Sequence, residues 1–141
     1  MKRYMLDTNI VSHCIKQEPN VIQHLLAVPM HQLCISVITE GELLFGLDKR
    51  PRATRLKRAV HEFLRRVEVL AWGRSTAACY GHIRAQLSTA GCNIAPSDLL
   101  IAAQALDKHA ILVTNDQAFA QISALTLEDW TEPFNQSGKL K

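Results

Sequence analysis

The chain of 141 residues has 48% hydrophobic and 21% charged residues, a balance typical of one globular domain with a substantial core. No apolar run approaches the roughly 20 residues that span a bilayer, and Asp7 interrupts the start before any signal segment. We therefore expect a cytoplasmic protein without membrane contact. Its formal net charge of +3 is too small to make the whole surface polycationic.

Four widely spaced cysteines lie among apolar neighbours and form no C-x-x-C pair. Such a pattern predicts free thiols rather than zinc ligands or disulfides. The four are Cys14, Cys34, Cys79 and Cys92.

A short apolar run near the start of the chain ends in an acid. Residues 4–6 predict a strand, Asp7 follows it, and residues 10–16 have a helical pattern. In open α/β sheets functional groups collect where strands end and helices begin. Capping of the following helix is the alternative role for Asp7. A second short helix is predicted over residues 21–27, capped by Asn20.

Residues 33–37 predict a buried strand that runs directly into a helix over residues 38–46. Ser36 or Thr39 would cap this helix. Its inward side is predicted to carry Ile38, Leu43, Leu44 and Leu47.

Two acids of this helix compete for one role. Glu40 and Glu42 lie roughly 200° apart around a helix, so only one of them can face a cleft. Their spacing alone does not choose between them.

Basic residues are concentrated in one segment. Eight of the sixteen Lys and Arg residues lie between residues 49 and 66, against the single acid Glu62. Apolar residues recur there at helical spacing, so the segment predicts a helix with one basic face. Such a face is either simply solvated or contacts nucleic-acid phosphates.

The next elements alternate again. Residues 67–72 have the pattern of a half-exposed strand. A long helix is predicted over residues 75–90, with Ala78 among its inward residues, and Gly91 would close it in the left-handed conformation.

Two further acids lie beside predicted elements, one in the first turn of a helix and one after a strand. Residues 94–105 predict a helix that is apolar on all sides and therefore buried, with Ser97 as its cap and Asp98 in its first turn. Residues 110–113 predict a buried strand of a parallel sheet, and the polar run 114–116 follows it.

The chain is expected to finish with a short helix, an edge strand over residues 125–127 and Trp130 covering the core. We place the domain at residues 1–132 and a flexible tail at residues 133–141. Strands separated by helices predict an α/β fold with a central, mainly parallel sheet of four to five strands between helical layers.

Acids recur where the predicted strands end and the helices begin: Asp7, Glu42 or Glu40, Asp98 and Asp116. The carboxyl ends of parallel strands meet at one edge of a sheet, so these acids are expected to converge there. Carboxylates about 4 Å apart repel by roughly 4 kcal/mol at an effective dielectric near 20, so such a cluster needs protons or a cation. Oxygen ligands without a cysteine or histidine motif favour Mg²⁺ or Mn²⁺ over zinc.

Cation-binding acids next to a basic helix indicate phosphodiester chemistry. One bound ion, or two, would activate a water and stabilise the charge that develops on the leaving oxygen.

As an ordered set, four segments resemble the motifs of PIN-domain nucleases, in particular the VapC toxins of bacterial type II toxin–antitoxin systems. The segments are Met5-Leu6-Asp7-Thr8-Asn9, Glu42-Leu43-Leu44-Phe45-Gly46, Ile94-Ala95-Pro96-Ser97-Asp98-Leu99-Leu100-Ile101-Ala102, and Val113-Thr114-Asn115-Asp116 closing on Phe119. The resemblance extends from residue 3 to about residue 130.

The resemblance implies roles for individual residues. It selects Glu42, because the family pattern is an acid followed by a hydrophobe and, four residues on, by a glycine. The implied metal-binding catalytic acids are Asp7, Glu42, Asp98 and Asp116. The implied supporting hydrogen-bonding residues are Thr8, Asn9, Thr114 and Asn115.

The resemblance further implies a PIN-like three-layer α/β/α fold and Mg²⁺-dependent RNA cleavage, with Mn²⁺ as the alternative ion. It implies a homodimer, a VapB-like antitoxin whose tail blocks the site, and a higher assembly with that antitoxin. Some relatives that this chain resembles cut initiator tRNA in its anticodon loop, so tRNA is an expected substrate. The expected RNA contacts are Arg55, Arg58, Arg74 and Arg84.

Other functions are compatible with parts of the pattern. A catalytically silent RNA-binding or protein-binding domain on the same fold would bind without turnover. A phosphatase of the haloacid dehalogenase type also begins with a strand ending in Asp, but it needs a second Asp where this chain has Asn9. A receiver domain needs paired acids after its first strand.

Overall fold

The computed structural model describes residues 2–135 and has one five-stranded sheet with the order β3-β2-β1-β4-β5. Every neighbouring pair of strands is parallel, which confirms the predicted α/β fold and places β1 at the centre of the sheet. The strands are β1 (Tyr4–Leu6), β2 (Leu33–Ser36), β3 (Glu68–Leu70), β4 (Ile111–Val113) and β5 (Leu127–Glu128).

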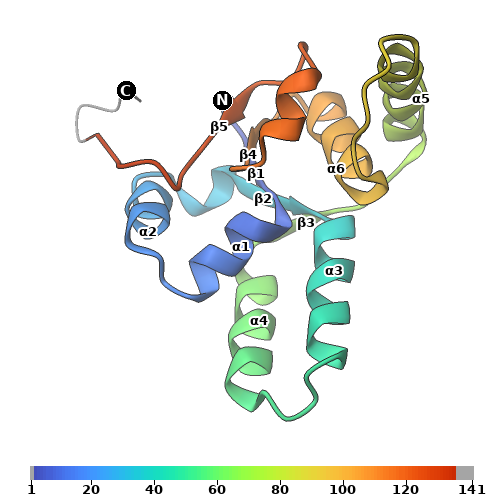
Figure 1. Cartoon of the computed structure of the whole chain (residues 1–141). Coiled ribbons are helices and arrows are strands. Elements are labelled where there is room, and N and C mark those ends of the chain that lie inside the picture. The colour runs from blue at the N-terminus through green and yellow to red at the C-terminus, as the bar shows by residue number, and fades with distance from the viewer. Residues whose placement is uncertain (1, 136–141) are drawn as a thin grey trace.

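Helices cover both faces of the sheet, and α3 and α4 extend away from it as a pair (Figure 1). The α-helices are α1 (Thr8–Ile15), α2 (Pro19–Leu26), α3 (Val37–Asp48), α4 (Thr54–Arg66), α5 (Arg74–Thr89) and α6 (Pro96–Asp107). Two short 3-10 helices are η1 (Met30–Gln32) and η2 (Gln117–Gln121). No helix within residues 2–135 is long and apolar enough to cross a membrane.

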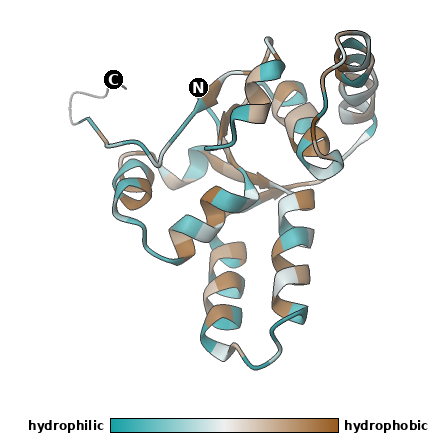
Figure 2. Cartoon of the chain, viewed as in Figure 1, coloured by the Kyte–Doolittle hydropathy of each residue, from teal (hydrophilic) through white to brown (hydrophobic). Residues whose placement is uncertain are grey.

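Alternation along the strands builds two hydrophobic cores. Met5 and Leu112 pack into the core that includes residues of α5 and α6, whereas Leu6 and Val113 pack into the core formed with α1, α3 and α4. Side chains of a strand point to opposite faces in turn, so strands such as β1 and β4 contribute to both cores. Figure 2 shows hydrophobic strands at the centre of the molecule and a hydrophilic loop joining α3 to α4.

Polar residues start the helices that leave the sheet. Asp7 caps α1 by accepting from the Ile10 N–H, and the Ser36 hydroxyl caps α3 by accepting from the Ile38 N–H. Gly91 adopts a φ of 71° just after α5, as predicted, because a residue without Cβ enters this region without a steric penalty.

Three of the predicted helix starts are wrong. Asn20 does not cap α2, because Pro19 already occupies the first turn, and the Asn20 side chain donates to the Thr131 carbonyl instead. Ser97 does not cap α6 either, since the N-cap is Ala95. The basic helix begins at Thr54 rather than at residue 49.

Two expected inward residues are exposed. Leu44 is 38% exposed because Thr39, Leu43 and Leu47 take the buried side of α3. Ala78 is also exposed, because Thr76, rather than Ala78, turns inward on α5.

The segment after β5 packs onto α2. The His24 ring stacks on Trp130 at 5.6 Å between centroids and contacts the edge of Phe134 at 5.0 Å. Trp130 is buried, as predicted, and its indole N–H donates to Glu128. Packing therefore continues to Phe134, beyond the expected boundary at residue 132, whereas residues 136–141 of the expected tail lie outside the described residues.

All four cysteines are free, as predicted. Cys14 and Cys34 are buried, and burial raises the pKa of the Cys14 thiol to about 12 and that of Cys34 to about 11. Both thiols therefore stay protonated at neutral pH.

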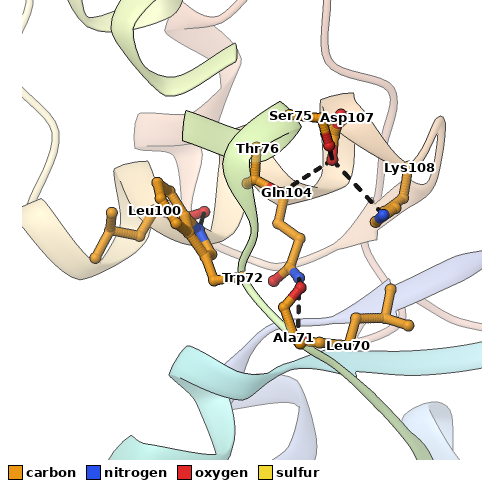
Figure 3. Close-up of polar contacts among 9 residues, drawn as sticks. All are labelled: Leu70, Ala71, Trp72, Ser75, Thr76, Leu100, Gln104, Asp107 and Lys108. Atoms are coloured by element: carbon orange, nitrogen blue, oxygen red, sulfur yellow. Dashed lines mark hydrogen bonds and ion pairs between the residues drawn. The ribbon is translucent and has the colours of Figure 1, made fainter. Parts of the chain in front are cut away.

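A buried amide fastens β3 to α6 (Figure 3). Gln104 is fully buried, and its Nε2 donates to the carbonyls of Leu70 at 3.0 Å and Ala71 at 2.9 Å. Trp72 donates from its indole nitrogen to the Leu100 carbonyl at 3.1 Å. Within the described residues Gln104 Oε1 has no hydrogen-bond partner.

Replacing Gln104 with methionine is expected to lower the free energy of unfolding by about 2 kcal/mol. The two carbonyls then lose their buried donor, while relief of the unpaired Oε1 offsets part of the cost. Urea denaturation measures the change, with Gln23→Met on the exposed side of α2 as control. A loss at position 104 no greater than in the control would contradict this account.

Candidate active site

Asp7 lies at the carboxyl end of the central strand. One of its oxygens, Oδ1, accepts from the Ile10 N–H at 2.9 Å, and its own N–H donates to the Val113 carbonyl of β4 at 3.1 Å. Only 4% of the residue is exposed. Capping fixes this carboxyl at the junction of β1, β4 and α1.

Burial raises the pKa of the Asp7 carboxyl from 3.8 to about 6. Hydrogen bonds from the Thr114 side chain and the Ile10 amide oppose this rise, and the charges of Asp98 and Asp116 add to it. A carboxylate at this position is costly unless a proton or a cation neutralises it.

Asp98 is half-buried in the first turn of α6. Burial raises the pKa of its carboxyl, and the negative charges of Asp116 and Glu42 raise it further. Asp98 also acts on Asp7, so it lies within electrostatic reach of each of the other three acids. All four predicted acids are thus brought to the same edge of the sheet.

Glu42 is the acid of α3 that reaches this edge. Its Oε1 accepts from the Thr8 hydroxyl on α1, and its Oε2 accepts from the Ser97 hydroxyl on α6 at 3.2 Å. The Thr8 oxygen also lies 3.3 Å from that of Thr39, which is fully buried. Glu42 therefore joins the starts of two other helices.

Asp116 follows β4 and is held by the backbone around it. Its Oδ1 accepts from the Ala118 N–H at 2.9 Å and caps η2, while its own N–H donates to the Thr114 hydroxyl at 3.0 Å. The buried Thr114 contacts both Asp7 and Asp116 in this way.

The four predicted supporting residues divide into two pairs. Thr8 and Thr114 are bonded to the acids, as described above. Asn9 and Asn115 are exposed, and within residues 2–135 no side-chain hydrogen bond links either of them to the site.

The acids are neighbours rather than a closed cage. Across the described part of the chain, no three Asp, Glu, His or Cys side chains are gathered tightly enough to enclose an ion. Asp7, Glu42 and Asp116 each accept from a neighbouring donor instead.

A groove of about 360 Å³ runs from Thr8 and Glu42 between α1, α3 and α4. Its walls are largely apolar, and three cations line it: Lys16, Lys49 and Arg50. Sequence reasoning included Lys49 and Arg50 only as part of the basic segment 49–66, and it missed Lys16, because only the packing of α1 against α3 and α4 brings Lys16 beside them. The position of Lys49 and Arg50 in the loop after α3 was the available signal.

The four predicted RNA-contact arginines are all exposed. Arg55 and Arg58 lie on α4 away from the buried Val60, and the groove lining includes neither of them. Arg74 begins α5, and Arg84 donates to the Tyr80 hydroxyl at 2.8 Å.

Known proteins are similar to this chain in sequence and fold. The model of the PIN domain matches residues 4–125. Ribonuclease VapC2 of Haemophilus influenzae is 37% identical over 131 residues, which cover 92% of this chain and 99% of the relative. The tRNA(fMet)-specific endonuclease VapC of Shigella flexneri is 33% identical over 132 residues, covering 93% and 100% of the two chains.

Solved structures agree with these matches. A chain of the DNA-bound VapBC of Salmonella typhimurium superposes with a TM-score of 0.85 at 35% identity, covering 92% of this chain and 99% of that one. VapBC2 of Rickettsia felis, bound to a DNA fragment from its promoter, gives 0.83 at 32% identity, with coverages of 90% and 98%. On this sequence, fold and site, the chain belongs to the PIN-domain family and, within it, to the VapC ribonucleases.

Proposed function

We propose that this VapC-type ribonuclease is a Mg²⁺-dependent endoribonuclease that acts as the toxin of a VapBC-type module. It would hydrolyse RNA phosphodiester bonds and so inhibit translation. The observation that supports this most strongly is the convergence of four acids at one edge of the sheet. Asp98 and Asp116 lie near the buried Asp7, and Glu42 is bonded to the residues next to Asp7 and Asp98.

The donor set fits a hard divalent cation. All four side chains offer carboxylate oxygens, which Mg²⁺ and Mn²⁺ prefer. Burial, and then the like charges of the neighbouring acids, raise the pKa of Asp7 and Asp98, so a cation that neutralises these carboxylates would relieve the cost. Asp7, Glu42, Asp98 and Asp116 would hold the ion.

When bound, the cation would lower the pKa of a coordinated water and stabilise charge on the leaving oxygen of the phosphodiester. The residues of the chain supply positioning. Asp7 and Asp116 are fixed by backbone donors, and Glu42 is fixed by hydroxyls from α1 and α6. Any of the acids that stays outside the coordination sphere can accept the proton of the attacking water.

The RNA strand is proposed to pass along the groove beside Glu42. Lys16, Lys49 and Arg50 would contact its phosphates, and the apolar walls would contact its bases. The exposed arginines of α4 and α5 stay candidates for more distant parts of the substrate. Because the relative from Shigella flexneri is a tRNA(fMet)-specific endonuclease, tRNA is the first substrate to test.

A VapB-like antitoxin and a homodimer are proposed as partners. Relatives of this chain were solved as VapBC complexes, including one bound to promoter DNA. Large hydrophobic side chains are available for such contacts on α2, η1 and α3. They are Leu26, 80% exposed, Met30, 54% exposed, and Phe45, 64% exposed.

Substituting Asp98 with asparagine is expected to lower RNA cleavage at least a hundredfold and to abolish growth arrest when the chain is expressed alone. The matched control is Asp48→Asn, at the exposed end of α3, which should cleave like the wild type. Cleavage of purified tRNA is followed with Mg²⁺ and with EDTA. RNA binding without turnover at any Mg²⁺ concentration would instead favour the silent-domain function.

The substitution Asp7→Asn separates catalysis from stability. Asparagine can still cap α1, but it removes a carboxyl group whose pKa rises on folding from 3.8 to about 6. Because folding raises this pKa, the ionised carboxyl lowers the free energy of unfolding of the metal-free wild type, and this cost is fully present above about pH 6. The wild type therefore gains stability as the pH falls from about 6 to about 4. In EDTA at pH 7.5 the variant should be more stable by about 1–3 kcal/mol.

The same variant should lose cleavage, and Mg²⁺ should no longer raise its melting temperature as it does that of the wild type. Urea unfolding and thermal melting, each with Mg²⁺ and with EDTA, give both answers. An Asp7→Asn chain that is less stable than the wild type in EDTA would contradict the charge argument.

Substituting two pairs of basic residues tests whether RNA passes along the groove or over the exposed face of α4. In an uncleaving Asp116→Asn background, Lys49→Ala with Arg50→Ala is expected to reduce the slope of log affinity against log salt by about 1 to 2. Arg55→Ala with Arg58→Ala tests the exposed face of α4 in the same assay. A pair that leaves both RNA affinity and slope unchanged is excluded from the path.

A further inference from the structure

Ser97 has a hydroxyl that the helix around it does not use. It lies at the second position of α6, where serine often bonds to nearby backbone, but the N-cap of this helix is Ala95. The Ser97 hydroxyl donates instead to Glu42 Oε2 at 3.2 Å, across to α3. The neighbour of Ser97 on α6 is Asp98.

Glu42 is held from two sides. Thr8, at the start of α1, donates to Oε1, and Ser97 donates to Oε2. Both oxygens of the carboxylate are thus fixed, by residues that each directly follow or precede another acid of the site, Asp7 and Asp98.

Without such partners Glu42 would not stay where it is. Glu42 is only partly buried on α3, and its flexible side chain loses rotamer freedom when it is fixed. Asp98 directly follows Ser97, to which Glu42 is bonded, so the two carboxylates carry like charge close together and repel each other. Repulsion favours rotamers that take the carboxylate away from Asp98, and the hydrogen bond from Ser97 opposes them.

We infer that Ser97 is a positioning residue, whose hydroxyl holds the Glu42 carboxylate beside Asp98 so that both acids can bind one divalent cation. This inference rests on the proposed function of the site. A carboxylate oxygen has two lone pairs, so Oε2 can accept from Ser97 and still bind a cation. Partners of this kind orient metal ligands before the ion arrives.

The test compares Ser97→Ala, which lacks the hydroxyl, with Ser97→Thr, which keeps it. Mn²⁺ and Mg²⁺ binding to the RNA-free chain is measured by calorimetry, with Ser123→Ala in an exposed loop as control. The alanine variant is expected to bind the cation about tenfold more weakly. The threonine and control variants should bind within about twofold of the wild type.

Kinetics give a second readout. At saturating cation the Ser97→Ala variant should recover most of its kcat, and its KM for RNA should match the wild type, because Ser97 does not line the groove. A raised KM at saturating cation would assign Ser97 to RNA contact and overturn the inference.

A metal-free measurement tests the hydrogen bond itself. In EDTA, Ser97→Ala should lower the melting temperature in the wild-type background but not in a Glu42→Ala background, because the partner is already absent there. Equal losses in both backgrounds would show that Ser97 acts through another contact.

The outcomes separate this inference from the proposed function. If the wild type binds the cation and Ser97→Ala weakens binding, but no RNA is cleaved, the function fails and the positioning role stands. If the wild type cleaves RNA and Ser97→Ala binds the cation normally, the positioning role alone is overturned. A wild-type chain that binds no cation overturns both.

Discussion

Burial of the Asp7 carboxyl beside other acids is the constraint on which the site depends. Asp7 is placed by the central strand in an apolar setting, and Asp98 and Asp116 add like charge around it. Folding tolerates this arrangement because backbone N–H groups and hydroxyls hold three of the acids, Asp7, Glu42 and Asp116, in place. The protein thus gives up stability at this edge of the sheet to keep charge available for chemistry.

The sheet explains why these groups meet at all. With β1 between β2 and β4 and all strands parallel, the segments after Leu6, Ser36 and Val113 leave the same edge. Each then enters a helix whose N-cap is a polar residue, Asp7, Ser36 or Asp116. The same residues therefore cap the helices and line the site. Asp7 does cap α1, one of the two roles weighed for it, and this cap is compatible with the proposed catalytic role.

Local chemistry made much of this predictable. Apolar runs, caps and the recurrence of acids indicated the parallel sheet and the convergence of Asp7, Asp98 and Asp116. The partner of Ser97 was not predictable, because it is far away in the chain on another helix. The contribution of Lys16 to the groove was missed for the same reason, and Leu44 was misplaced because its exposure depends on how α3 is rotated against the sheet.

The central position of β1 in the sheet also determines when the site can form during synthesis of the chain. Its neighbour β4 is made long after it, and Asp7 needs Val113 and Thr114 from that later segment. A growing chain on the ribosome therefore has its first acid without the others until most of the protein has emerged. The acidic site would therefore be complete only when translation of the chain is nearly finished.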